Sequence, residues 1–357
     1  MDLPPPGSPV EDDLKPDLPY VVGARLKIQQ CQPHRPFGIS FQDQTSRTYH
    51  WNPMLKWETA SEFCVQNPPL EGQPIANPEK RTIVIDSKLA CGDGRGSQLV
   101  KCRDEDGGAS FVAKIYDPLY HLWPSNLDPT HEADEHFTTE ATVYMMLQDM
   151  HKANTFGYPR VRDHLKGSTP QYYGSYTWQT QLLDGRRRDV RLILMEYLPF
   201  PNMWAIIKKN KVENIPAEIR MQLLKRVLEI DSWLIYYGID QNDFAARNIL
   251  VDPDQGRVVF VDFGIAMIRN LYNSEWATPR DKPLPALPIS PIERWGCKWG
   301  DEMGSWVPKE YRTARARYDW FMKVWGQSKE FRPLGVIWLK HHKPNLQKAI
   351  AREEMEE

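Results

Sequence analysis

Two short segments of the sequence combine acidic and amide side chains that could act together on one substrate. The segment DFAARN runs from Asp243 to Asn248, and a second segment, DFG, begins at Asp262. Carboxylate and amide oxygens are ligands for Mg²⁺, and a carboxylate can also orient a hydroxyl group and accept its proton. Phosphoryl transfer requires both functions, because the protein mainly positions groups and neutralises charge in that reaction. The two segments therefore predict metal-assisted phosphoryl transfer; the alternative is an Asp and an Asn in an ordinary turn beside a core strand.

Predicted helices and strands around these segments would hold them in place. Apolar residues recur at three- and four-residue spacing after Pro216, which predicts a long amphipathic helix. Two short apolar strands are predicted at residues 249–251 and 258–261. Asn248 therefore directly precedes one strand, and Asp262 directly follows the other.

A glycine-rich segment lies between two predicted strands in the first half of the chain. It contains Gly92, Gly94 and Gly96, and glycines allow backbone N–H groups to approach phosphates closely. The next predicted strand, residues 111–115, carries Lys114 twenty-two positions after Gly92. Taken alone, each feature has a simpler explanation, since glycine-rich hairpins and solvated strand lysines are common.

Together these segments resemble the protein-kinase superfamily, whose catalytic loop reads HRDLxxxN and whose metal-binding motif reads DFG. The segment that begins at Asp243 is also similar to the DLAARN loop of tyrosine kinases, and the resemblance covers about residues 81–270. It implies that the cofactors are ATP and Mg²⁺. The implied site residues are Asp243 as catalytic base, Arg247 as a group that neutralises the transferring phosphate, Lys114 as a ligand of the α- and β-phosphates, and Asn248 and Asp262 as magnesium ligands.

The same resemblance implies a site for the rest of the nucleotide. Leu99 and Val112 would cover the adenine ring, and the backbone of the connector from Glu196 to Leu198 would bind its edge. A carboxylate on a helix should hold Lys114. The predicted partner is Glu140, because its helix neighbours look core-facing; the competing carboxylates are Glu132, Asp134 and Glu135.

The expected fold class is α+β, a two-lobed protein-kinase-like domain with a β-sheet N-lobe and a mainly helical, shortened C-lobe. The predicted divisions are a disordered tail (1–18), an N-terminal extension with a Pro-rich linker (19–80), the N-lobe (81–197) and the C-lobe (198–357), which includes a Pro-rich loop (279–291) and C-terminal helices. Aromatic and β-branched residues between positions 20 and 63 show no clear period, so no helix or strand is predicted there.

The sequence departs from the family pattern at the catalytic loop and beyond it. Gln241 and Asn242 replace the His and Arg that precede the catalytic Asp, and no APE motif follows DFG. This truncated form resembles fungal kinase-like proteins and the aminoglycoside-phosphotransferase-like branch. The resemblance therefore implies a protein or small-molecule hydroxyl as acceptor. The rival hypothesis is a pseudokinase, a scaffold that binds nucleotide or protein without turnover.

Residues 282–288 carry a separate hypothesis, because a lysine there is followed by prolines three residues apart. Such a segment suits the aromatic-lined grooves of SH3-type partners, and a plain proline-rich linker is the alternative.

Composition and charge argue against several other classes. The formal net charge of −2 gives no reason to expect a nucleic-acid or membrane partner. Five cysteines without a CxxC pair argue against a disulfide framework or a Cys-based zinc site. No apolar stretch approaches the roughly 18 residues of a transmembrane helix, and the first residues lack the features of a signal peptide. We therefore expect a soluble intracellular protein, cytoplasmic or nuclear.

Overall fold

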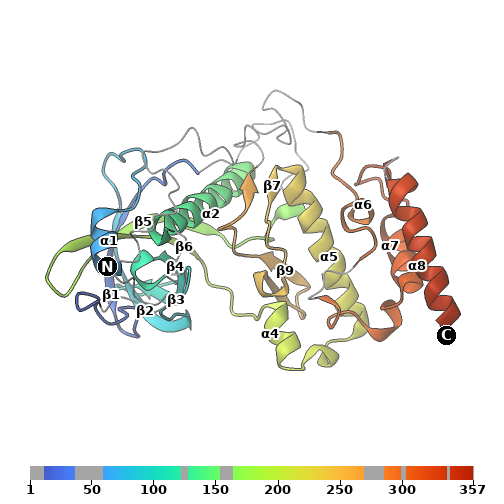
Figure 1. Ribbon diagram of the computed structural model, residues 1–357, viewed down its shortest axis with the longest axis horizontal. Coiled ribbons are helices and arrows are strands. Elements are labelled where there is room, and N and C mark those ends of the chain that lie inside the picture. Colours follow the sequence, from blue (N-terminus) through green and yellow to red (C-terminus); the bar gives the residue numbers. More distant parts are fainter. Residues whose placement is uncertain are drawn as a thin grey trace, which may run out of the picture.

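A closed antiparallel barrel of six strands forms one end of the molecule (Figure 1). The computed structural model describes residues 12–36, 59–121, 128–152, 164–268, 285–298, 303–335 and 338–356. Around the barrel the strands follow the order β1-β2-β3-β4-β6-β5. Their bounds are β1 (Arg25–Gln30), β2 (Lys80–Ala90), β3 (Gln98–Asp104), β4 (Ser110–Tyr116), β5 (Tyr172–Gln181) and β6 (Arg187–Glu196).

Strand β1 closes the barrel, although the sequence predicted no element in this stretch. It pairs with β2 on one side and with β5 on the other, where Ile28 lies opposite Trp178. Leu26 and Ile28 are buried, whereas Lys27 between them is exposed. This alternation spans too few residues to be recognised in the sequence, so the strand is determined by its partners rather than by its own pattern.

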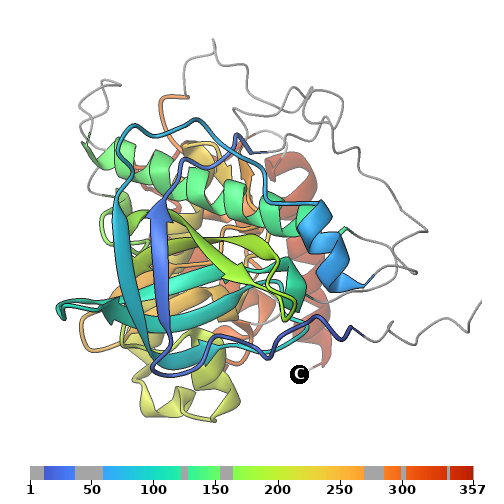
Figure 2. The same ribbon diagram turned by 90° about the vertical axis from the view of Figure 1, so that its left-hand side faces the viewer.

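Helix α2 (Pro129–Lys152) runs across the barrel and contacts β4, β5 and β6 (Figure 2). Phe137, Ala141 and Tyr144 are buried, and their spacing of four and three residues places them on one helix face. A second, short helix, α1 (Ala60–Gln66), begins at the N-cap Thr59, whose hydroxyl accepts a hydrogen bond from the backbone N–H of Glu62.

Helices dominate the C-terminal part, at the other end of the molecule (Figure 1). They are α4 (Met203–Lys208), α5 (Ala217–Tyr236), α6 (Pro291–Trp295), α7 (Ala314–Trp325) and α8 (Lys343–Glu356). Two small antiparallel sheets pair β8 (Ile249–Asp252) with β9 (Arg257–Phe260), and β7 (Ile239–Asp240) with β10 (Met267–Ile268). Short helical turns are η3 (Pro118–Tyr120), η4 (Val212–Asn214), η5 (Ala246–Asn248), η8 (Lys309–Tyr311) and η9 (Trp338–His342).

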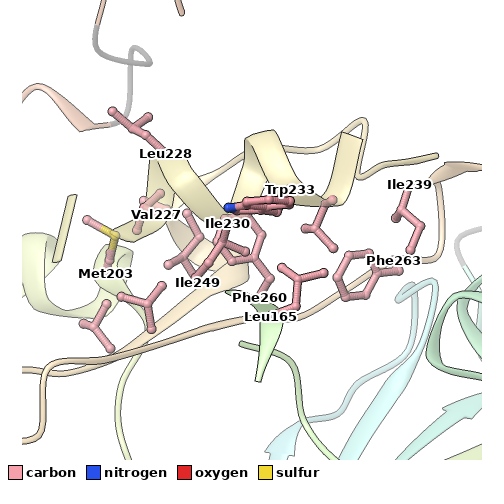
Figure 3. Packing of buried hydrophobic residues seen from close by; sticks show 14 of the residues in the cluster. Leu165, Met203, Val227, Leu228, Ile230, Trp233, Ile239, Ile249, Phe260 and Phe263 are labelled. Carbon is pink, nitrogen blue, oxygen red and sulfur yellow. The ribbon is translucent and has the colours of Figure 1, made fainter. Parts of the chain in front are cut away.

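Helix α5 provides the core on which the small sheets rest. Its side chains Val227, Ile230 and Trp233 pack in one cluster with Ile249 of β8 and Phe260 of β9 (Figure 3). Val227 and Ile230 belong to the three- and four-residue periodicity from which the sequence predicted this helix. The loops that adjoin β8 and β9 are therefore attached to a packed core.

The combination of a barrel with a helical part confirms the α+β class. Within the described ranges, no helix has both the length and the apolar character needed to cross a membrane.

The barrel-closing role of β1 can be tested by truncating one of its buried side chains. We expect Ile28→Ala to lower the free energy of unfolding by about 2–5 kcal/mol, because the substitution leaves a cavity in the barrel core. The matched control Lys27→Ala, on the exposed side of the same strand, should change it by less than about 0.5 kcal/mol. Urea denaturation measures both values, and equal effects of the two substitutions would contradict this assignment of the strand.

Candidate active site

Lys114 lies at the centre of a buried cluster of charges. Its Nζ atom is 2.5 Å from Oε2 of Glu140 and 2.7 Å from Oδ1 of Asp262. Burial alone would lower the pKa of Lys114, but the two carboxylates outweigh burial and the net shift is upward. Lys114 is therefore a permanent cation, held in place by groups from two other segments of the chain.

Helix α2 supplies Glu140, which is fully buried. The hydroxyl of Tyr116 donates a second hydrogen bond to Oε2 of Glu140, at 2.7 Å. Burial raises the pKa of Glu140, and Lys114 opposes that shift. Of the competing carboxylates on the helix, Asp134 accepts a hydrogen bond from the backbone N–H of Leu70. Glu132 pairs with His121. Among the ion pairs of the described residues, Glu140 is the only carboxylate of this helix that contacts Lys114.

Asp262 follows β9 and has a positive φ of 66°, a conformation that Asp adopts more readily than most residues. Its side chain is 49% exposed, so one side of the carboxylate faces Lys114 and the other remains open to solvent. The Lys114 ammonium lowers the pKa of Asp262, which keeps the carboxylate ionised at neutral pH. An anionic, half-exposed oxygen donor of this kind suits Mg²⁺.

Gly264 allows the chain after Asp262 to pass close to helix α2. A Cβ atom at this position would lie 3.3 Å from the Cβ of His136 and 3.5 Å from Oε2 of Glu140. Burial, and then the charge of Lys114, lower the pKa of His136 to about 4. The ring above Gly264 is therefore neutral near pH 7, and the positive charge of this cluster is that of Lys114.

The catalytic-loop residues form a compact group around Asp243. One oxygen of Asp243 accepts a hydrogen bond from Arg247 at 2.6 Å, and the other accepts one from Nδ2 of Asn248 at 2.8 Å. Nδ2 of Asn248 also donates to the backbone carbonyl of Asp243. Because these bonds use the amide nitrogen of Asn248, its amide oxygen is the atom suited to a metal ion.

Gln241 connects this loop to Asp262, a role that the sequence analysis missed. Its buried Nε2 donates to the carbonyl of Val261 at 2.7 Å and to that of Asp262 at 3.4 Å. The N–H of Val261 in turn donates to the carbonyl of Asn248 at 2.9 Å. In the sequence Gln241 stands out only as a departure from the family pattern, yet a polar residue between a predicted helix and the predicted catalytic loop was a signal for a buried hydrogen bond.

The glycine-rich loop differs from the expected phosphate cradle. The N–H of Gly92 donates to the side chain of Gln98 at 2.8 Å, and the N–H groups of Gly94 and Arg95 donate to the carbonyl of Tyr120 at 2.9 and 3.2 Å. A Cβ atom on Gly96 would lie 3.4 Å from Nε2 of His121. The tip of the loop is therefore folded against η3, and these amide groups already have acceptors within the protein.

The other residues that the sequence predicted for a nucleotide site lie along β3, β4 and β6 and in the connector that follows. Leu99 is opposite Lys114 in the β3–β4 register, and Val112 is opposite Met195 in the β4–β6 register. The carboxylate of Glu196 binds Arg257, 3.3 Å away, which links β6 to β9. The N–H of Glu196 donates to the carbonyl of Gln171. Leu198 is buried two residues further along the connector.

Only part of the proline-rich segment at 282–288 can be examined, because residues 282–284 lie outside the described ranges. Pro288 is buried, and its carbonyl accepts a hydrogen bond from the N–H of Arg332 at 2.9 Å. The carbonyl of Pro285 accepts one from the hydroxyl of Tyr236. The described part of the segment is thus bonded to α5 and to the chain after α7, and the SH3-type hypothesis stays a prediction.

The pairing of Lys114 with Glu140 can be tested through its pH dependence. We expect Lys114→Met to lower the free energy of unfolding by about 3–5 kcal/mol near neutral pH, because Glu140 is left buried without its cation. The folded variant then keeps a proton on Glu140, whereas the unfolded chain releases it at a pKa of about 4.3. The deficit relative to wild type should therefore grow as the pH rises above about 4.3, as measured by urea unfolding at each pH.

The double variant Lys114→Met/Glu140→Met serves as the control, because it removes both partners. Its free energy of unfolding, relative to wild type, should lack the pH-dependent decrease expected for Lys114→Met. If Lys114→Met showed the same deficit at every pH, Glu140 would not be held as a carboxylate in the wild-type protein.

Comparison with known proteins finds kinase structures of low overall similarity. A Plasmodium kinase domain is 14% identical, covers 66% of this chain and 57% of its own, and has a TM-score of 0.35. The kinase PK-1 of Cydia pomonella granulovirus is 16% identical, with coverages of 52% and 55% and a TM-score of 0.34. Rad53 1-466 in complex with AMP-PNP is 16% identical, with coverages of 51% and 38% and a TM-score of 0.32.

The matched part therefore spans between about two fifths and three fifths of those solved chains. No protein-family model and no curated protein matches the sequence.

The arrangement of the site itself identifies the fold. Protein kinases hold a strand lysine against a helix glutamate, beside the Asp of DFG and a loop that carries Asp and Asn. Here Lys114 contacts Glu140 and Asp262, and Gln241 joins Asp262 to the loop of Asp243. The chain has a protein-kinase-like fold.

Proposed function

We propose that this protein is an ATP- and magnesium-dependent phosphotransferase that transfers the γ-phosphoryl group to a hydroxyl acceptor. The observation that carries the proposal is the position of Lys114, held between Glu140 and Asp262 at 2.5 and 2.7 Å. A scaffold has no need to bury this charge beside a half-exposed carboxylate. A nucleotide site does, because Lys114 and a metal ion on Asp262 together neutralise phosphate charge.

The residues of the chain fit the roles that this reaction requires. ATP would supply the phosphoryl group, and Mg²⁺ would neutralise the charge on its oxygens. Asp262 and the amide oxygen of Asn248 would hold the metal ion, and Lys114 would bind the phosphates. Asp243 would orient the acceptor hydroxyl and take its proton, because each carboxylate oxygen can accept a further hydrogen bond beside the one it accepts now. Arg247, whose side chain is 52% exposed, would then bind the transferring phosphate.

The proposal includes a two-lobed arrangement with the nucleotide between the barrel and the helical part. Leu99 and Val112 would cover the adenine ring, and the connector from Glu196 to Leu198 would bind its edge. The shortened C-lobe leaves the acceptor class open to protein and small-molecule hydroxyls. The link between Glu196 and Arg257 supports this arrangement, because it joins the connector to the strand that precedes Asp262.

The glycine-rich loop favours a second candidate, a pseudokinase that binds nucleotide or protein without turnover. The amide groups of Gly92, Gly94 and Arg95 donate to Gln98 and Tyr120 instead of facing an open site. Nucleotide binding without transfer would be the outcome that selects this candidate.

A calorimetric titration with ATP, with and without Mg²⁺, tests the proposed function first. We expect wild type to bind ATP more tightly with Mg²⁺ and Asp262→Asn to lose that gain, because the metal ion loses its anionic ligand. The matched control Asp254→Asn changes an exposed aspartate in the β8–β9 turn and should behave as wild type.

Turnover is then measured with γ-labelled ATP and Asp243→Asn. This variant should bind ATP within about twofold of wild type but transfer phosphate roughly 10²–10⁴ times more slowly, because it lacks the base. Binding by wild type without transfer to protein, small hydroxyl compounds or water would favour the pseudokinase. No binding under any condition would refute both candidates as nucleotide-binding proteins.

A further inference from the structure

Helix α6 contacts the catalytic loop through an aromatic side chain. The ring of Trp295 lies 4.3 Å from the ring of Phe244, centroid to centroid, and Phe244 is the residue after Asp243. The ring of Phe244 is also 6.0 Å from that of Phe260, the last residue of β9. Phe244 therefore contacts both α6 and the strand that leads to Asp262. Through this one side chain, the loop of Asp243 and the segment of Asp262 are packed against the same aromatic cluster.

The neighbouring residue, Arg294, connects α6 to two acidic side chains. Its Nε is 3.1 Å from Oδ2 of Asp231 on α5, and its Nη2 is 3.4 Å from Oδ1 of Asp240 on β7. The indole N–H of Trp295 donates to the same oxygen of Asp231 at 3.1 Å. Asp231 is almost fully buried, so its charge depends on these two partners.

Asp240 lies three residues before Asp243, and β7 pairs with β10, which follows the DFG segment. Arg294 is thus bonded to the start of the catalytic loop, while Trp295 packs on its middle. Burial raises the pKa of Asp231, and the guanidinium of Arg294 opposes that shift.

The five-residue helix α6 is itself fixed to the rest of the helical part. Its N-cap is Ser290, whose hydroxyl accepts the N–H of Ile292, and it ends at Gly296 in the left-handed conformation. Glu293 binds the guanidinium of Arg332 at 2.9 Å and the N–H of Gly335 at 3.3 Å. A helix this short has little stability of its own, so these side-chain contacts determine where Arg294 and Trp295 lie.

We infer that Arg294 and Trp295 are positioning residues, which hold the loop of Asp243 at a fixed distance from Asp262. Neither residue contacts the charged cluster at Lys114; both act through Phe244, Asp231 and Asp240. The inference rests on the proposed function, because the distance between Asp243 and Asp262 matters only where one group acts on the acceptor and the other on the metal ion. In such a site, a displacement of about 1 Å can reduce the rate a hundredfold.

The test compares two tryptophans that make similar bonds to α5. Trp295 donates to Asp231, and Trp325 donates to Glu229 at 2.9 Å, but the described ring contacts of Trp325 are with α7 residues and not with the catalytic loop. The variants Trp295→Ala, Trp295→Phe and Trp325→Ala are made in the full chain. Each is measured for phosphate release from Mg-ATP (kcat and KM), for hydrogen exchange of residues 241–248, and for stability in urea.

For Trp295→Ala we expect kcat to fall roughly tenfold to a hundredfold while KM for ATP stays within about twofold, because the loop moves but the nucleotide ligands remain. Exchange in residues 241–248 should become faster. Trp295→Phe retains an aromatic ring against Phe244 and should keep kcat within about threefold of wild type. Trp325→Ala should lose stability but keep kcat, KM and loop exchange close to wild type.

Unchanged kcat and unchanged exchange in a folded Trp295→Ala protein would overturn the inference. Equal losses of kcat in Trp295→Ala and Trp325→Ala would also overturn it, because they would mean that both substitutions act only by lowering stability. If Trp295→Ala does not fold, Trp295→Phe decides the question. Hydrogen exchange of residues 241–248 at the wild-type rate supports the packing role of the ring, and exchange as fast as in the unfolded chain overturns the inference. If wild type neither binds nor hydrolyses Mg-ATP, the proposed function fails, and hydrogen exchange alone then decides whether Trp295 holds the loop.

Discussion

The burial of the Lys114 ammonium between two carboxylates constrains every element around it. A buried charge is costly unless it is paired, and removing one partner of such a pair typically costs about 3–5 kcal/mol. Its partners Glu140 and Asp262 lie 26 and 148 residues away in sequence, on α2 and after β9. The charge can therefore be satisfied only when the barrel, the helix across it and the small sheet on α5 have all reached their final positions.

Hydrogen bonds also join the loop of Asp243 directly to the segment of Asp262. Gln241 donates to the carbonyl groups of Val261 and Asp262, and the N–H of Val261 donates to the carbonyl of Asn248. A neutral amide thus takes the place of the His that the family has before the catalytic Asp. Because an amide does not titrate, this link persists at any pH at which the fold itself is stable.

The candidate site was easier to predict from the sequence than the fold, because its chemistry restricts the residue types that can form it. Asp243, Asn248, Asp262 and Lys114 could be named as candidates from the sequence, because few residue types can hold a metal ion or a phosphate. Glu140 was harder, since four of the carboxylates on α2 were candidates and only the packing of the helix selects one. Strand β1 could not be predicted, because its six residues become a strand through pairing with β2 and β5. Gln241 was missed for a related reason: its role depends on a carbonyl twenty residues further along the chain.

The internal hydrogen bonds of the glycine-rich loop do not weigh heavily against nucleotide binding. A neutral backbone bond contributes about 0.5–1.5 kcal/mol net, whereas a bond to a charged group contributes about 1.5–3 kcal/mol. Exchanging the bonds of Gly94 and Arg95 to the carbonyl of Tyr120 for bonds to phosphate oxygens would therefore be favourable or neutral. The charged cluster has no such alternative explanation, because Asp262 keeps a half-exposed anionic carboxylate beside the buried Lys114. Of the two features, the charged cluster is the stronger guide to function, and it supports the phosphotransferase over the scaffold.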